Sequence, residues 1–182
     1  MSTIAPPSRP KLTRGAVEYL LSQRQVSARV SLVGIRGYYK DTMGKPGEND
    51  RGIYDDALFL VSGEVFAAFN ANTDPSVYRA GIASLKAGVW RYKLGIHGLS
   101  KPKSQQYRAL VQAGPVTVFR DGRGDDTGMF GINIHRGGTT GTSSLGCQTI
   151  VPTQWPAFIS LVTQELLRAD GQVVIPYVLV EQ

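Results

Sequence analysis

Short apolar runs, separated by loops rich in glycine, proline, asparagine and aspartate, follow one another along most of this chain. Two of them, 57–61 and 65–69, flank Ser62-Gly63, a pair typical of a tight turn, and predict a β-hairpin. Further strand-like runs are 28–35, 88–94, 116–120, 130–135 and 173–180, while 105–112 fits either a short helical turn or a strand. Pro176, in the last run, indicates an edge strand or a bulge. The pattern predicts a mainly β fold with a few short helices.

Two segments carry apolar residues at helical spacing. The first follows Thr13, and the second follows Thr153 and stops before Gly171; the hydroxyls suit a helix cap and the glycine suits a helix end. Their apolar positions are Ala16, Val17, Leu20 and Leu21 in the first, and Trp155, Phe158, Ile159, Val162 and Leu166 in the second. The Pro- and Ser-rich residues 1–11 are expected to be flexible, and residues 12–182 to form a single domain.

A second hairpin is predicted from the runs 116–120 and 130–135, which flank the polar loop 121–127. Strand alternation separates the side chains of its second arm into two faces, with Phe130, Ile132 and Ile134 on one and Asn133 and His135 on the other. We therefore expect the apolar face to be buried and His135 to point into a cleft.

Cys147 is the only cysteine of the chain and lies in a loop of small and hydroxyl residues, twelve positions after His135. A thiol attacks as its thiolate, and a nearby imidazole can take its proton. The arrangement predicts a nucleophilic cysteine with His135 as general base. The alternatives are a buried structural cysteine and a strand-end histidine that only bonds to a loop.

The run Ser144-x-Gly146-Cys147, after a strand that ends in His135, resembles the catalytic motif of the YkuD-type L,D-transpeptidases. The resemblance covers about residues 115–150. It implies an L,D-transpeptidase-like β-sandwich or barrel that acts on peptidoglycan stem peptides. Leu145 stands where the family has a second histidine, and Gln148-Thr149 where it has an arginine or asparagine. These departures favour a divergent branch, such as a phage endolysin or an injected cell-wall enzyme.

The resemblance also implies roles for the neighbours of the two central residues. The backbone carbonyl of Arg136 corresponds to the group that orients the family's imidazole, and Ser144 corresponds to a Ser/Thr that either bonds to substrate or braces the loop. The backbone amides of Gly146 and Cys147 are candidates for an oxyanion hole.

Two further polar residues are candidates for the substrate cleft. Asn133 shares the face of His135 and could help to orient it. His97, in a His-Gly pair, is a second candidate for the base, with a cleft role favoured because it lies about fifty positions before Cys147.

Charge and composition limit the partners. The net charge is +6, but the basic residues are scattered and no nucleic-acid motif is present, so no nucleic-acid partner is expected. One cysteine and two histidines leave no recognisable metal site and exclude an internal disulfide, and no cofactor is implied. No stretch is long and apolar enough to span a bilayer, and residues 1–10 hold no signal-peptide core. We expect a monomer that reaches the cell wall by lysis or specialised export.

The predicted function is a cysteine enzyme that forms a thioester acyl-enzyme on peptidoglycan stem peptides. The resemblance implies cleavage after meso-diaminopimelate or a similar residue, with transfer to water or to an amine. Two alternatives remain open: a non-catalytic module that binds the cell wall, and a β-rich cysteine peptidase that acts on protein substrates.

Overall fold

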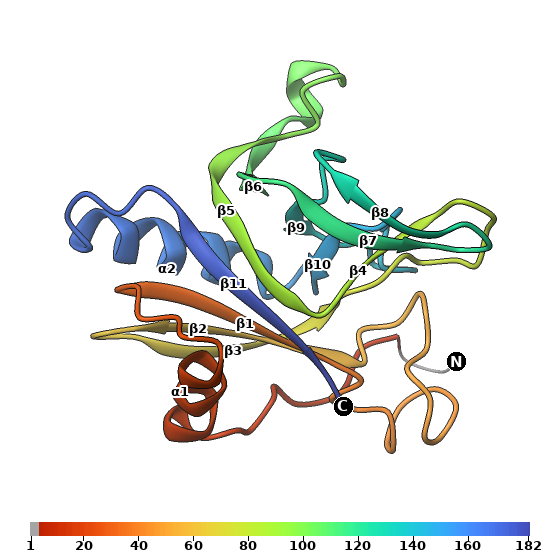
Figure 1. Ribbon diagram of the computed structural model, residues 1–182, viewed down its shortest axis with the longest axis horizontal. Helices are drawn as coiled ribbons and strands as arrows, with labels where there is room; N and C mark the ends of the chain where they lie inside the picture. The colour runs from red at the N-terminus through yellow and green to blue at the C-terminus, as the bar shows by residue number, and fades with distance from the viewer. Residues whose placement is uncertain (1–3) are drawn as a thin grey trace.

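The strand-like runs of the sequence form a closed barrel with a smaller sheet beside it, in a computed structural model that describes residues 4–182 (Figure 1). The barrel strands are β1 (Val30–Arg36), β2 (Asp56–Ser62), β3 (Phe66–Asn72), β5 (Gly88–His97), β6 (Tyr107–Gln112), β9 (Ile134–Arg136), β10 (Gln148–Ile150) and β11 (Ile175–Glu181). The smaller sheet contains β4 (Ala83–Leu85), β7 (Val116–Arg120) and β8 (Gly124–Gly128). The helical segments are α1 (Arg14–Gln23), the 3-10 helix η1 (Lys103–Gln105) and α2 (Trp155–Arg168). The predicted mainly β, single-domain architecture is confirmed at this level.

Around the barrel the strands follow the order β1-β11-β5-β6-β9-β10-β3-β2, and β2 pairs again with β1. The pairs β1–β11 and β9–β10 are parallel, and the other pairs in the barrel are antiparallel. β5 and β6 pair from Tyr92–Gln112 to His97–Tyr107, whereas β6 meets β9 at Leu110–Ile134. The pairings that β9 and β10 make with their neighbours are therefore the shortest in the barrel.

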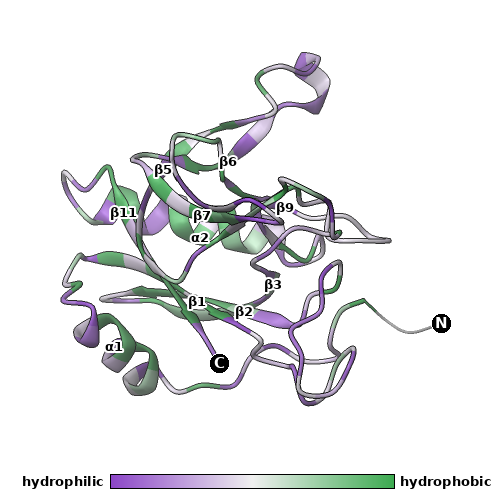
Figure 2. Ribbon diagram, turned by 45° about the vertical axis from the view of Figure 1, so that its right-hand side comes forward, coloured by the Kyte–Doolittle hydropathy of each residue, from purple (hydrophilic) through white to green (hydrophobic). Residues whose placement is uncertain are grey.

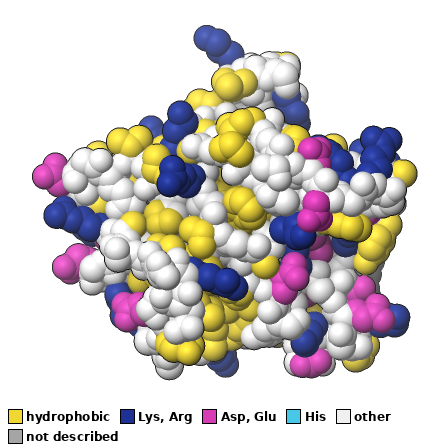
Figure 3. Space-filling model, viewed as in Figure 1, with side chains coloured by type: hydrophobic (Ala, Val, Ile, Leu, Met, Phe, Trp, Pro, Cys, Tyr) yellow, Lys and Arg dark blue, Asp and Glu magenta, His cyan; other side chains and the backbone are white. Residues whose placement is uncertain are grey.

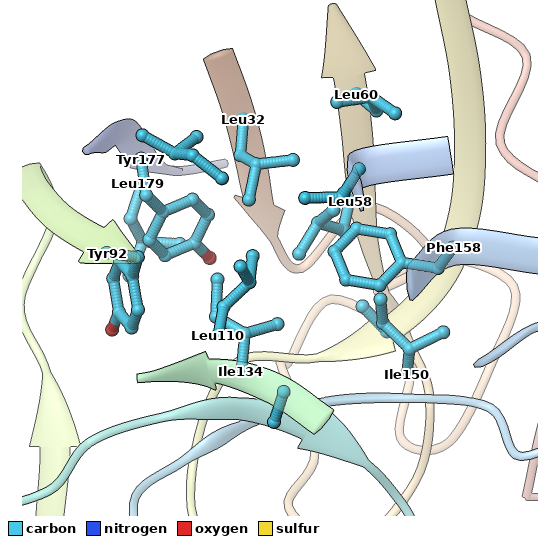
Figure 4. Packing of buried hydrophobic residues seen from close by; sticks show 14 of the residues in the cluster. Leu32, Leu58, Leu60, Tyr92, Leu110, Ile134, Ile150, Phe158, Tyr177 and Leu179 are labelled. Carbon is cyan, nitrogen blue, oxygen red and sulfur yellow. The ribbon is translucent and has the colours of Figure 1, made fainter. Parts of the chain in front are cut away.

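The core fills the barrel interior and extends under α2 (Figure 4). Apolar side chains from different strands point toward one another there, among them Leu32, Leu58, Tyr92, Leu110, Ile134, Ile150 and Tyr177. Phe158 of α2 packs edge-on against Phe69, with ring centroids 5.2 Å apart. Figure 2 shows that the central strands carry much of the hydrophobic sequence, whereas the loops at the rim are mostly hydrophilic. Burial of this apolar surface is the main stabilising contribution to the fold.

α1 covers the outer face of β1 and β2 and buries a second apolar cluster there. Leu32 faces the barrel interior, while its neighbour Val33 faces Val17 and Leu21 of the helix cluster. The helix begins as predicted, because the Thr13 hydroxyl accepts a hydrogen bond from the backbone N–H of Ala16 at 3.2 Å. The two covered faces explain why β1 and β2 read as continuous apolar runs rather than as an alternation.

The hairpin predicted for 57–61 and 65–69 is confirmed as β2 and β3, with Val61 opposite Phe66. The run 105–112 forms β6 after the short helix η1. Pro176 pairs with Arg91 of β5, while the pairing of β11 with β1 starts one residue later at Tyr177. β11 therefore has one neighbour at the proline, where the missing N–H is tolerated.

The second hairpin was predicted with the wrong partner. Residues 116–120 pair with β8 at 124–128, within the segment that the sequence presented as a loop, and not with 130–135. Positive φ at Gly122 (70°) and Gly124 (85°) allows the chain to reverse earlier. β8 is polar because it is a solvent-facing strand, with Asp126 bonded to Arg120 at 2.6 Å. Residues 130–133 are consequently non-regular, and the strand that carries His135 is the short β9.

The predicted cap of α2 was also wrong. The helix is preceded by Gln154 and not by Thr153, and no side chain caps its first turn. The Gln154 side chain instead accepts a hydrogen bond from the backbone N–H of Asn70 at 2.9 Å, which ties the start of the helix to β3. The expected helix end is confirmed, because α2 stops at Arg168 and Gly171 has a φ of 78°.

Residues 1–3 of the N-terminal segment lie outside the described residues. The part that follows lies along the body of the protein. The carbonyl of Ile4 accepts a hydrogen bond from the Tyr54 N–H at 2.7 Å, and the Lys11 N–H donates to the Tyr38 hydroxyl at 2.9 Å. These contacts position residues 4–11 against the loop after β1 and the strand that follows it.

Candidate active site

Neighbouring strands place Cys147 and His135 on the same side of the sheet. In the parallel pair β9–β10, Ile134 lies opposite Gln148, and His135 lies opposite Thr149. Ile134 and Gln148 are fully buried, and the Gln148 side chain accepts a hydrogen bond from the Tyr177 hydroxyl inside the barrel. Because alternate residues of a strand face opposite sides, His135 and Cys147, the residue just before β10, face away from the barrel interior. Within residues 4–182, however, no hydrogen bond joins the Cys147 thiol to the His135 imidazole.

The imidazole of His135 is held by the backbone. Its Nδ1 lies 2.8 Å from the carbonyl oxygen of Arg136, the group that the resemblance implied, and 3.3 Å from the Tyr107 hydroxyl. A carbonyl only accepts hydrogen bonds, so Nδ1 carries the proton and Nε2 keeps the free lone pair. Burial, followed by the charge of His97, lowers the pKa of His135 to about 4. At neutral pH the ring is therefore uncharged and able to accept a proton at Nε2.

The Cys147 thiol is partly buried against the non-regular segment before β9. Its Sγ accepts a hydrogen bond from the Asn133 N–H at 3.4 Å and lies 3.5 Å from the Gly131 carbonyl oxygen. Burial raises the pKa of this thiol, and the Asn133 amide opposes the effect. Both the Cys147 thiol and the His135 imidazole are consequently neutral at pH 7, which does not favour a stored thiolate.

Ser144 braces the loop that carries the cysteine. Its side chain is buried, and its hydroxyl donates to the Cys147 carbonyl at 2.7 Å and accepts from the Gly146 N–H at 3.0 Å. Ser76 adds a second link, because its hydroxyl accepts from the Ser144 N–H at 2.7 Å. Of the two roles left open for Ser144, the geometry supports the brace.

Gly146 is required for backbone reasons. Its φ is 132°, and a Cβ at this position would lie 2.6 Å from the carbonyl oxygen of Ala83. Its N–H is engaged with Ser144, whereas the N–H of Cys147 has no hydrogen-bond partner within residues 4–182. Of the two amides proposed for an oxyanion hole, the Cys147 amide is the one left open.

His97 belongs to the same site, although it is distant in sequence. Its ring stacks on that of His135, with centroids 4.0 Å apart and planes 22° from parallel. Asn133 lies beside His97, with Nδ2 3.5 Å from its Nδ1, and uses its Oδ1 to accept from the Gln112 N–H at 3.2 Å. Asn133 thus contacts His97 rather than His135. Burial, followed by the charge of Lys101, lowers the pKa of His97 as well.

A groove of about 650 Å³ runs along this edge of the site. Its lining comes from β5, the 98–101 loop and the segment before β9, and includes Lys93, His97, Leu99, Lys101, Gly131 and Asn133. Gly131 and Asn133 are the residues whose backbone contacts the Cys147 thiol, so the groove ends next to the sulfur. Cys147 and His135 do not themselves line the groove.

Two residues of the site were not predicted from the sequence. Tyr107 contacts the His135 ring and lies under the Arg136 guanidinium, which is 5.1 Å from its ring centroid. The Gln112 side chain accepts from the N–H groups of Phe130 and Ile132 at 3.1 and 3.0 Å and so fixes the segment beside the thiol. Both lie on β6, whose conformation the sequence left open, and no local signal marks them.

Comparisons with known proteins do not identify this site. No protein-family model, curated protein or solved structure matches the chain. Within residues 4–182, no helix is long and apolar enough to cross a membrane. On the face shown in Figure 3, lysine and arginine side chains are dispersed among acidic and apolar ones. The function must therefore be inferred from the geometry around Cys147.

Proposed function

We propose that the protein is a cysteine acyltransferase or hydrolase that acts on peptidoglycan stem peptides. The observation that carries the proposal is the orientation of His135. The Arg136 carbonyl holds Nδ1–H, so Nε2 is left as a base on the face of the sheet that also carries the Cys147 thiol. A neutral imidazole can act as the general base for a neutral thiol once the two are brought within hydrogen-bond distance.

The chemistry follows from this pair. The Cys147 sulfur attacks a peptide carbonyl carbon while His135 Nε2 takes the thiol proton, and the Cys147 N–H is placed to donate to the resulting oxyanion. The imidazolium then gives its proton to the departing amine, the C–N bond breaks and a thioester remains. Water or a second amine attacks the thioester, His135 accepts its proton, and the sulfur leaves and is protonated again.

The peptidoglycan substrate is supported by the motif and by the groove. The motif Ser144-x-Gly146-Cys147, after His135, is the part of the chain that resembles the L,D-transpeptidases. Lys93 and Lys101 line the groove and give it positive charge, which suits the carboxylates of stem peptides. These features support the substrate class and leave water and amine equally possible as acceptors.

The test is to incubate purified protein with Gram-negative sacculi and to analyse the released muropeptides by mass spectrometry. Cys147→Ala removes the nucleophile, and His135→Gln removes the base. We expect changes in the stem peptides that both variants abolish, with new cross-links indicating transfer and lost cross-links indicating hydrolysis. The same effect from Cys147→Ala would establish a binding module instead. Cleavage of casein with no effect on sacculi would establish a peptidase that acts on proteins.

A further inference from the structure

Four side-chain oxygens lie buried without a hydrogen-bond donor, near the point where the loop between β1 and β2 meets the end of β3. They are Oδ1 of Asn49, Asp55, Asn72 and Asp74. Hydrogen bonds connect the segments that carry them: Asn49 to Asp74, Asn72 to Asp74, and the Asp50 N–H to Asp55. We refer to these four residues as the oxygen cluster. Buried oxygens are rarely left without a donor, so the cluster requires an explanation.

The orientation of the two amides is fixed by their nitrogen atoms. Asn49 Nδ2 donates to Oδ2 of Asp74 at 2.6 Å, and Asn72 Nδ2 donates to the Asp74 backbone carbonyl at 2.5 Å. Turning either amide over would place an oxygen against these acceptors, so each Oδ1 must be the atom without a donor. Asp55 behaves similarly, because its Oδ2 accepts from the Asp50 N–H at 2.8 Å and its Oδ1 is left over.

The neighbouring charged groups do not supply the missing donors. Arg36 uses its guanidinium on the Thr73 hydroxyl and carbonyl, on the Leu85 carbonyl and on Glu181. Asp56 is a further carboxylate of the region, and it is saturated by the N–H groups of Gly37 and Thr73 and by the Thr73 hydroxyl. Within residues 4–182, no charged side chain therefore donates a hydrogen bond to the Oδ1 atoms of the cluster, although the charge of Arg36 acts on Asp74 from nearby.

Burial makes this arrangement costly. Asp55 and Asn72 are 0% exposed and Asp74 is 4% exposed. A buried carboxylate oxygen that has neither a donor nor a cation destabilises a fold, whereas a bound cation would offset the cost.

We propose that the oxygen cluster binds a divalent cation, Ca²⁺, through Oδ1 of Asn49, Asp55, Asn72 and Asp74. Two carboxylate and two amide oxygens form a set of hard ligands of the kind that Ca²⁺ prefers, and its flexible coordination allows water to complete the shell. Mg²⁺ is a poorer fit because it demands octahedral geometry and dehydrates reluctantly. The sequence does not indicate this site, because its four donors are spread over residues 49–74 and half of them are asparagines.

The site is connected to the loop that carries the thiol. Ser76 follows Asp74 by two residues and donates its N–H to the Ser144 carbonyl at 2.9 Å. Tyr54, next to Asp55, donates its hydroxyl to the Gly138 carbonyl at 2.7 Å. A cation at the oxygen cluster would fix both contacts, and it would stabilise the protein whether or not Cys147 is catalytic.

The test is thermal unfolding of the whole chain, after dialysis against a chelator and during titration with CaCl₂ or MgCl₂. At a calcium concentration about a hundredfold above Kd, we expect Tm to rise by roughly 5–10 °C, and by less with magnesium. Asp74→Asn and the milder Asn49→Ala should each reduce this rise. The matched control is Asp125→Asn, which removes an exposed carboxylate of β8 and should respond as the wild type does.

Isothermal titration with CaCl₂ provides a second readout that does not depend on the variants. Binding of one calcium ion per chain, weakened by Asn49→Ala and unchanged by Asp125→Asn, would support the site. An unchanged Tm and no binding heat at millimolar calcium would overturn it. Stabilisation by acid with no response to calcium would also overturn it, since protons bound to Asp55 and Asp74 would then take the place of the cation.

Discussion

Protonation of His135 should destabilise the fold by an amount that can be measured. Burial and the charge of His97 lower its pKa from 6.5 to about 4, and the side chain is 5% exposed, so solvent screens the effect little. Between pH 6.5 and 4, His135 binds a proton in the unfolded chain but not in the folded chain. Stability is therefore lost as the pH falls through this window, and the contribution is constant above it. The full difference corresponds to about 3 kcal/mol.

The assay compares the wild type with His135→Gln. Glutamine does not titrate, and its amide can still donate to the Arg136 carbonyl. Urea unfolding, followed by tryptophan fluorescence at several pH values from 7.5 to 4, gives the free energy of unfolding of each protein at each pH. The quantity compared is the free energy of unfolding of the wild type minus that of His135→Gln. Carboxylates such as Asp55 and Asp74 titrate in both proteins and cancel in the difference. That difference should fall with a slope of up to about 1.4 kcal/mol per pH unit below pH 6.5.

A flat difference across this range would refute the reasoning, because His135 would then titrate alike in the folded and unfolded chains. His97→Gln provides an internal check. Since the charge of His97 contributes to lowering the pKa of His135, its removal should move the His135 transition to higher pH. The Arg136 hydrogen bond is untouched by this variant, so a change in the transition reports on the stacked pair itself.

Three further changes test the site and the core. Alkylation of Cys147 by iodoacetamide should be slower at pH 7 than that of free cysteine and should accelerate as the pH rises, because burial raises the thiol pKa; a fast, pH-independent rate would indicate a stored thiolate. Gly146→Ala should lower the unfolding free energy by about 1–3 kcal/mol in urea titrations, because its φ of 132° and the Ala83 carbonyl both oppose a Cβ. Phe158→Ala should cost about 3–5 kcal/mol in the same measurement, and a loss below 1 kcal/mol would show that the cavity under α2 collapses freely.

Locally encoded features could be predicted from the sequence. The β2–β3 hairpin depends on an apolar pattern around Ser62-Gly63, and α1 on a hydroxyl at Thr13 followed by an apolar face. Both signals lie within a few residues of the structure that they specify. The strand position of His135 was also predicted, but β9 is shorter than the apolar run indicated, and Asn133 precedes it in a non-regular segment.

Features that depend on distant contacts could not be predicted. β8 is a polar strand whose carboxylates pair with Arg120 of β7 and with Lys86, the residue after β4, and it therefore resembles a loop in sequence. Tyr107 reaches His135 only because β6 and β9 become neighbours in the barrel. The unpaired oxygens around Asp74 arise where the loop between β1 and β2 meets the end of β3.

The brief pairing around β9 and β10 has a consequence for motion. Short strand pairings such as those of β9 and β10 open by local fluctuation at a lower free energy than global unfolding requires. Backbone amides of residues 134–136 and 148–150 should therefore exchange with solvent deuterium sooner than those of β1 and β2, which pair over longer stretches. Each such opening separates Cys147 from His135. Heating should consequently abolish the proposed reaction of Cys147 at a lower temperature than that at which the barrel unfolds.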